Sequence, residues 1–190
     1  MRIGIAHHFG WAVAVSASAE HRVIDRRRID LIEPGHPVAP VHHEGGSFPL
    51  HGTDEPLDDV ALAALVAEVR ASSLRATAAA LHALAADLPE PVISLSLREW
   101  PDDFPQEIAV QRRVPHESRA DSVMYLRVLD EVARRQGWAV TRFNANRVEL
   151  EAARVLGDRA HEVLHGPGEI LGPPWGKDQR IALAATVVAV

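Results

Sequence analysis

The order of strand-like and helix-like segments is the feature that most restricts the fold of this chain. Runs of branched and apolar residues predict three short strands near the N-terminus, and strands joined by such brief connections form an antiparallel meander. Helical spacing then alternates with two further strand-like runs. The predicted strands cover residues 2–6, 11–17, 22–32, 92–97 and 138–143.

The predicted helices lie between and after the later strands. Apolar residues recur at 3.6-residue spacing in the first of them, and Pro89 and Pro91 end it. The second is expected to start at Ser118 as N-cap, with Asp121 three residues later in a position typical of a capping box. Residues 166–176 are turn-rich. The predicted helices cover residues 57–88, 118–136, 147–156 and 158–164, and a final one begins near residue 177.

This order predicts an α/β fold. Each of the two later strands is reached through a helix, so both should run parallel to the first strand. The result is a mixed five-stranded sheet with helices on both faces. The chain has 190 residues, of which 47% are apolar, which is enough for a sizeable core. We therefore expect residues 1–190 to form a single domain.

Composition narrows the classes of function. Cysteine is absent, which excludes disulfides, thiolate metal sites and cysteine nucleophiles. The first residues are too few and too polar for a signal peptide, and no apolar run is long enough to span a membrane, so we expect a cytoplasmic protein without a membrane partner. The net charge of −6 disfavours nucleic acid as a partner without excluding a local basic face. Self-association into a homo-oligomer is a further hypothesis.

Several short motifs resemble the ribonuclease H-like superfamily, especially its Holliday-junction-resolvase-like (RuvC/YqgF-like) branch. Ile3-Gly4-Ile5-Ala6 is similar to the first strand of that family, and Gly10 followed by Ala12-Val13-Ala14-Val15 is similar to its first hairpin. The resemblance covers nearly the whole chain through the order of the elements. It implies a sheet with strand order 3-2-1-4-5.

The resemblance also implies a type of chemistry. In that family, carboxylates from strand one, strand four and the last helix hold divalent metal ions for phosphodiester hydrolysis. By position, Glu99 matches the acid that follows strand four, and Asp178 matches the acid of the last helix. Ala6 occupies the position of the strand-one acid, and His7 and His8 follow it.

The predicted topology gathers polar residues at one edge of the sheet, because ligands of open α/β sheets bind at the carboxyl ends of parallel strands. Glu99, Asp178 and His7 are the catalytic candidates at this edge, and Lys177 and Arg180 are the substrate-binding candidates. Imidazoles combined with carboxylates suit manganese or zinc better than magnesium. The candidate metal ligands are His7, His8, His42, His43, Glu44, Glu99 and Asp178.

Each of these residues has an alternative interpretation without function. The two histidine pairs are also typical of exposed turns and loops. Glu99 is also typical of a charge at a strand end, and Asp178 of a first-turn acid that the helix dipole favours.

Three hypotheses about function follow. The first is a divergent nuclease or phosphodiesterase that uses a divalent metal such as Mg, Mn or Zn. The second is a non-catalytic binding or assembly protein of the same fold, which the missing strand-one acid and the acidic net charge favour. The third is a small-molecule enzyme, but no phosphate-binding glycine loop, GxSxG elbow or dinucleotide fingerprint supports it.

Overall fold

The computed structural model of the chain describes residues 1–45 and 55–189. Its strands are β1 (Arg2–His8), β2 (Trp11–Ala17), β3 (Val23–Asp30), β4 (Ser94–Arg98) and β5 (Ala139–Phe143). Its helices are α1 (Asp59–Asp87), α2 (Ile108–Gln111), α3 (Glu117–Arg135), α4 (Val148–Leu156), α5 (Ala160–Leu171) and α6 (Lys177–Val188). A π-helical turn, η1 (Val41–Gly45), precedes α1, and a 3-10 turn, η2 (Gly157–Arg159), joins α4 to α5.

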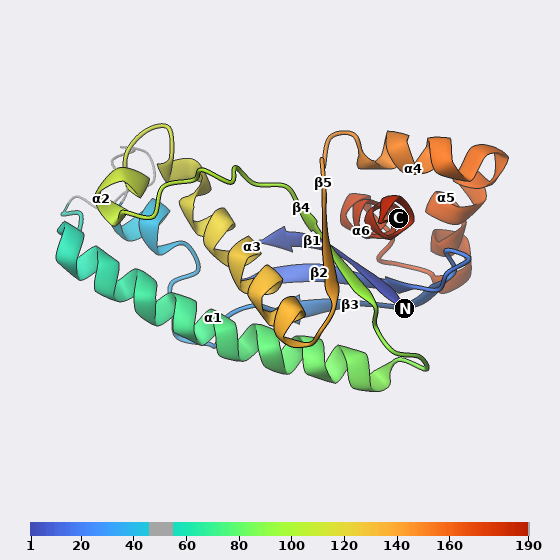
Figure 1. Cartoon of the computed structure of the whole chain (residues 1–190), viewed down its shortest axis with the longest axis horizontal. Helices are drawn as coiled ribbons and strands as arrows, with labels where there is room; N and C mark the ends of the chain where they lie inside the picture. Colours follow the sequence, from blue (N-terminus) through green and yellow to red (C-terminus); the bar gives the residue numbers. More distant parts are fainter. Residues whose placement is uncertain (46–54, 190) are drawn as a thin grey trace.

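The five strands form one mixed sheet in the order β3-β2-β1-β4-β5. The pairs β1–β2 and β2–β3 are antiparallel, whereas β1–β4 and β4–β5 are parallel. This is the strand order predicted for a ribonuclease H-like fold, with helices on both faces of the sheet (Figure 1). The carboxyl ends of β1, β4 and β5 therefore meet at one edge, as the sequence predicts.

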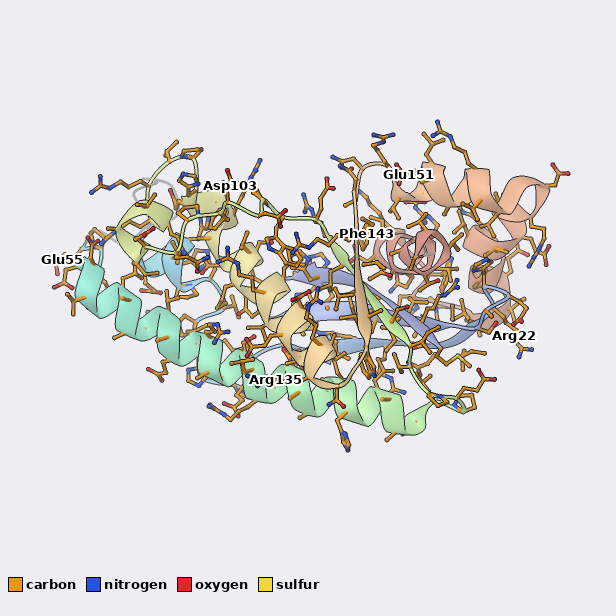
Figure 2. All side chains as sticks on the ribbon, viewed as in Figure 1. Arg22, Glu55, Asp103, Arg135, Phe143 and Glu151 are labelled. Atoms are coloured by element: carbon orange, nitrogen blue, oxygen red, sulfur yellow. The ribbon has the colours of Figure 1, made fainter. Side chains whose placement is uncertain are left out.

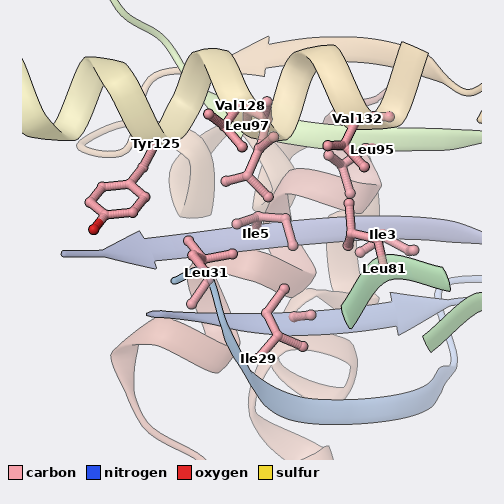
Figure 3. Close-up of a cluster of buried hydrophobic side chains, with 14 of the residues drawn as sticks. Ile3, Ile5, Ile29, Leu31, Leu81, Leu95, Leu97, Tyr125, Val128 and Val132 are labelled. Atoms are coloured by element: carbon pink, nitrogen blue, oxygen red, sulfur yellow. The ribbon is translucent and has the colours of Figure 1, made fainter. Parts of the chain in front are cut away.

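Helices α1 and α3 cover one face of the sheet. Ile3 and Ile5 of β1 point toward this face, where they lie beside Leu95 and Leu97 of β4 under the buried side chains of α3 (Figure 3). Tyr125 of α3 is fully buried, and its hydroxyl donates to the carbonyl of Val38 at 2.9 Å.

Helices α4, α5 and α6 cover the opposite face. The buried side chains of α6 pack there against Val13 and Val15 of β2. Gly4 of β1 lies directly beneath α6, and a Cβ atom at this position would lie 1.8 Å from the carbonyl oxygen of Ala182. The absence of a side chain at Gly4 thus permits close contact between helix and strand, which sets the position of the start of α6.

Helices α1 and α5 differ from their predicted bounds by two residues or more. Helix α1 begins at Asp59, and the Asp58 side chain caps it by accepting from the N–H of Ala61 at 2.8 Å. Helix α5 continues to Leu171 with Pro167 inside it, although residues 166–176 were predicted to be turns.

Contacts from outside α5 explain why the helix passes through residues with low helix propensity. The indole N–H of Trp175 donates to the carbonyl of Leu164 at 3.0 Å. The Arg26 guanidinium of β3 donates to the carbonyl oxygens of Leu171, Gly172, Pro173 and Pro174, which tie the link between α5 and α6 to the sheet. Tertiary hydrogen bonds therefore override the local preference.

Charged side chains such as Arg22, Glu55 and Asp103 lie at the periphery (Figure 2). In residues 1–45 and 55–189, every helix is too short or too polar to span a bilayer.

Candidate functional site

The two histidines at the end of β1 lie on opposite faces of the sheet. Successive side chains of a strand alternate between its faces, so His7 shares the α3 face with Ile5, and His8 shares the α6 face with Ala6. The Nε2 atom of His7 lies 2.7 Å from the hydroxyl oxygen of Ser122 in α3. The sheet therefore separates the predicted cluster into two parts.

On the α6 face, His8 pairs with the acid of the last helix. Its Nε2 atom lies 2.9 Å from Oδ2 of Asp178, which sits in the first turn of α6, where the helix dipole favours a carboxylate. The indole of Trp11 stacks on the imidazole, with ring centroids 4.1 Å apart. The two side chains are 40% and 35% exposed, so solvent and a ligand can reach the pair.

On the α3 face, His7 is held in its neutral form. Burial is the main cause that lowers the pKa of His7 to about 4, and the positive charge of Arg98 and the neighbouring His8 add to this effect. At neutral pH its imidazole carries no charge and can both donate and accept hydrogen bonds. Replacing His7 should therefore change the response of the protein to acid.

His7→Gln is expected to make the fold less sensitive to acid. The pKa of His7 is about 4 in the folded chain against 6.5 when unperturbed, so the unfolded chain gains a proton first as pH falls. Stability is thus lost between pH 6.5 and 4, and wild type should lose up to about 3 kcal/mol more than the variant. Urea unfolding at pH 7, 5.5 and 4 measures this difference. The exposed His161→Gln serves as control, and equal acid sensitivity of His7→Gln and wild type would contradict the burial argument.

Glu99 lies at the rim of a groove on the α3 side of the edge. Its backbone N–H donates to the carbonyl of Phe143 at 2.9 Å, which aligns the ends of β4 and β5. The side-chain amide of Asn144 donates to Oε1 of Glu99, and the side-chain Oδ1 atom of Asn144 accepts from the N–H of Asn146. The groove has a volume of about 540 Å³ and includes Ser122, the partner of His7, in its wall.

The second histidine pair belongs to a different cluster. The η1 turn docks on α3, where the buried Asp121 carboxylate accepts from the N–H groups of Val41 at 3.1 Å and His42 at 2.9 Å. The Nδ1 atom of His42 lies 3.1 Å from Oε1 of the buried Glu117. The structure thus places His42 beside the first turns of α3 and not beside the His8–Asp178 pair.

The residues that follow His42 in η1 also lie away from the His8–Asp178 pair. His43 is exposed and Glu44 is half-buried, and the rings of His42 and His43 lie 5.3 Å apart. Sequence reasoning missed the role of Asp121, because its place near the start of a helix suggested a capping box with Ser118. Helix α3 starts at Glu117 instead, with no side-chain cap, and Asp121 binds the backbone of η1.

The two substrate-binding candidates lie in the first turn of α6. Arg180 donates from Nε to Oε2 of Glu149 in α4 at 3.2 Å, so this guanidinium ties α6 to α4. Lys177 is exposed.

The described donors do not complete a metal site. Within residues 1–45 and 55–189, no group of three or more histidine, aspartate and glutamate side chains converges in a way that could hold a metal ion. His8 and Asp178 supply two adjacent donors, whereas His7, Glu99 and His42 each face another partner. This donor set does not fit a closed metal centre.

The strand order and strand directions are those of a ribonuclease H-like α/β fold. No protein-family model matches the sequence, and no curated protein matches it.

Two solved structures of RuvC from Thermus thermophilus are similar in shape. One is a complex with a Holliday junction substrate; it is 14% identical, with 98% of this chain and 89% of the other covered and a TM-score of 0.48. The second is 15% identical, with 98% and 90% covered and a TM-score of 0.45.

Proposed function

We propose that this protein is a divergent ribonuclease H-like phosphodiester hydrolase that acts on nucleic acid, with His8 and Asp178 as its reactive pair. The hydrogen bond between these two side chains carries the proposal, because it joins residues 170 positions apart at the carboxyl edge of the sheet. Ligands of open α/β sheets bind at this edge. Both side chains are open to solvent, as a reactive pair must be.

The position of His8 supports its role. In the family that the sequence resembles, the strand-one acid lies where this chain has Ala6. His8 is two residues further along the same strand and therefore lies on the same face of the sheet. It brings a titratable group back to the side of β1 from which that acid has been lost.

The chemistry of an aspartate–histidine pair is general-base catalysis. A carboxylate only accepts hydrogen bonds, so contact with Asp178 fixes the proton of His8 on Nε2 and leaves Nδ1 as an acceptor. Nδ1 can then remove a proton from a water molecule that attacks the phosphorus atom, while the leaving oxygen takes a proton from solvent. Asp178 orients the imidazole and stabilises the imidazolium that forms.

A cleavage assay tests this proposal. Wild type, His8→Gln and Asp178→Asn are incubated with linear, branched and single-stranded DNA and with RNA, with and without added Mn²⁺. Both substitutions should slow cleavage about 100-fold, because general-base groups contribute on the order of 100-fold or more to rate. His161→Gln is the matched control, since His161 is exposed on α5, and it should cleave like wild type. Absence of cleavage by wild type on every substrate, or full activity of His8→Gln, would refute the proposal.

Ala6 and the net charge of −6 favour a second candidate, a non-catalytic binding or assembly protein of the same fold. Its homo-oligomeric form is a proposal that light scattering coupled to size-exclusion chromatography tests. An assembly that survives chelator, in a protein without turnover, would favour this candidate over hydrolysis.

We also propose that residues 1–190 form one domain, because the cores on both faces share the same sheet. A single cooperative transition is then expected in urea.

A further inference from the structure

The groove at the ends of β4 and β5 lies apart from the His8–Asp178 pair. It opens on the α3 side of the sheet, while that pair lies on the α6 side. Its volume of about 540 Å³ falls within the range of roughly 300–1,000 Å³ that is typical of small-molecule sites. Its wall combines both charges with hydroxyl and amide groups and one aromatic ring, which is the composition of a polar ligand site.

One guanidinium group on the α3 side of this wall, that of Arg119, makes neither an ion pair nor a hydrogen bond within residues 1–45 and 55–189. Arg98 also borders the groove, but it lies in register with Phe143, which packs in the core of the α6 face, so the Arg98 side chain leaves β4 on that face. Arg142 and Arg127 nearby differ from Arg119, because Arg142 pairs with Asp102 and Arg127 donates to the carbonyl of Phe104. In a chain with a net charge of −6, an arginine that lines a groove without such a partner among the described residues is suited to a phosphate group.

The groove also contains an acceptor for N–H groups. Asn144 occupies Oε1 of Glu99, and in the described part of the chain the Oε2 atom of Glu99 has no hydrogen-bond partner. Glu99 is exposed at the rim, and the hydroxyl of Ser118 lies in the same wall. A carboxylate beside a guanidinium disfavours a bare phosphate ion and favours a ligand that also presents hydrogen-bond donors.

We propose that this groove binds a single guanine nucleotide, with its phosphate against Arg119 and its base edge against Glu99. Guanine presents two adjacent donors, N1–H and the N2 amino group, that a carboxylate accepts together. The proposal rests on the proposed action on nucleic acid, and it places an unpaired guanosine of the substrate strand on the α3 side of the edge. A base outside a duplex is the form in which this edge is accessible.

Isothermal titration calorimetry with mononucleotides tests the proposal without any need for cleavage. Wild type should bind guanosine monophosphate at least about tenfold more tightly than adenosine monophosphate or inorganic phosphate, a difference of about 1.4 kcal/mol. Arg119→Gln should weaken the binding of guanosine monophosphate about tenfold. Glu99→Gln should bind guanosine and adenosine monophosphates equally.

Arg113→Gln is the matched control, because Arg113 is exposed near α3 but does not line the groove, and it should bind like wild type. Circular dichroism confirms that each variant is folded. No preference for guanosine monophosphate in wild type, or unchanged binding by Arg119→Gln, would overturn the inference. Loss of cleavage in His8→Gln with intact nucleotide binding separates this site from the reactive pair, so the two proposals fail independently.

Discussion

Gly4→Ala is expected to lower the free energy of unfolding by about 4 kcal/mol, a large fraction of the roughly 5–15 kcal/mol that stabilises an ordinary domain. The new methyl group would lie 1.8 Å from the carbonyl oxygen of Ala182, a backbone atom of α6 that cannot rotate away. Either α6 moves off the sheet or β1 bends, and both responses break contacts in a fully buried core. Urea unfolding followed by circular dichroism measures the loss.

Gly166→Ala is the control for this substitution. A Cβ atom at Gly166 meets no atom within 4 Å, and alanine has the higher helix propensity, so this variant should be as stable as wild type or about 1 kcal/mol more stable. Gly4→Ala should also displace Asp178 from His8, because Asp178 lies in the first turn of α6 and moves with that helix. A Gly4→Ala protein of wild-type stability would show that α6 is not held by this contact.

Asp121→Ala is expected to destabilise the fold by about 3 kcal/mol and to release the η1 turn. Its carboxylate accepts from two backbone N–H groups, those of Val41 and His42, and the substitution leaves both without their acceptor. Each buried donor that loses its partner costs about 1–3 kcal/mol. Urea unfolding gives the loss of stability, and hydrogen exchange at the amides of Val41 and His42 reports the release of the turn.

The pH dependence of this effect distinguishes it from a simple loss of packing. Burial raises the pKa of Asp121 to about 6, so between pH 4 and 6 the folded chain holds a proton that the unfolded chain has lost. The contribution of Asp121 to stability is therefore largest at low pH and falls as pH rises through 6. The difference between wild type and Asp121→Ala should be greater at pH 4.5 than at pH 7.5. The exposed Asp103→Ala should show neither effect, and a difference that is independent of pH would contradict the raised pKa.

The strand order could be predicted from the sequence because it depends on the lengths of the connections and on the helices between strands. Three strands with short connections form a meander, and each later strand follows a helix, so few topologies remain. This order also predicts that the end of β1 and the start of α6 lie at the same edge of the sheet, and His8 and Asp178 are in contact there. The order of the elements does not say on which face a side chain lies, so it did not predict that His7 and His8 point to opposite faces.

The remaining part of the site depends on packing across long distances. The partners of His42 come from α3, more than seventy residues further along the chain, and nothing in the loop sequence specifies them. Likewise, α5 continues through Pro167 because side chains outside the helix donate hydrogen bonds to its carbonyl oxygens. Arg26 donates to the carbonyl of Leu171, and Trp175 donates to the carbonyl of Leu164. Local propensity cannot foresee hydrogen bonds from a distant strand.

The position of α6 after all five strands in chain order has a consequence for synthesis. During translation the whole sheet can form before α6 emerges, and at that stage Val13 and Val15 still lack the helix that buries them. His8 likewise waits for Asp178, which is made 170 residues later. A ribosome-bound chain that has not yet been extended to Lys177 therefore exposes apolar side chains of the sheet and lacks one member of the proposed reactive pair. The proposed hydrolase would then be inactive toward nearby messenger RNA until α6 has packed on the sheet.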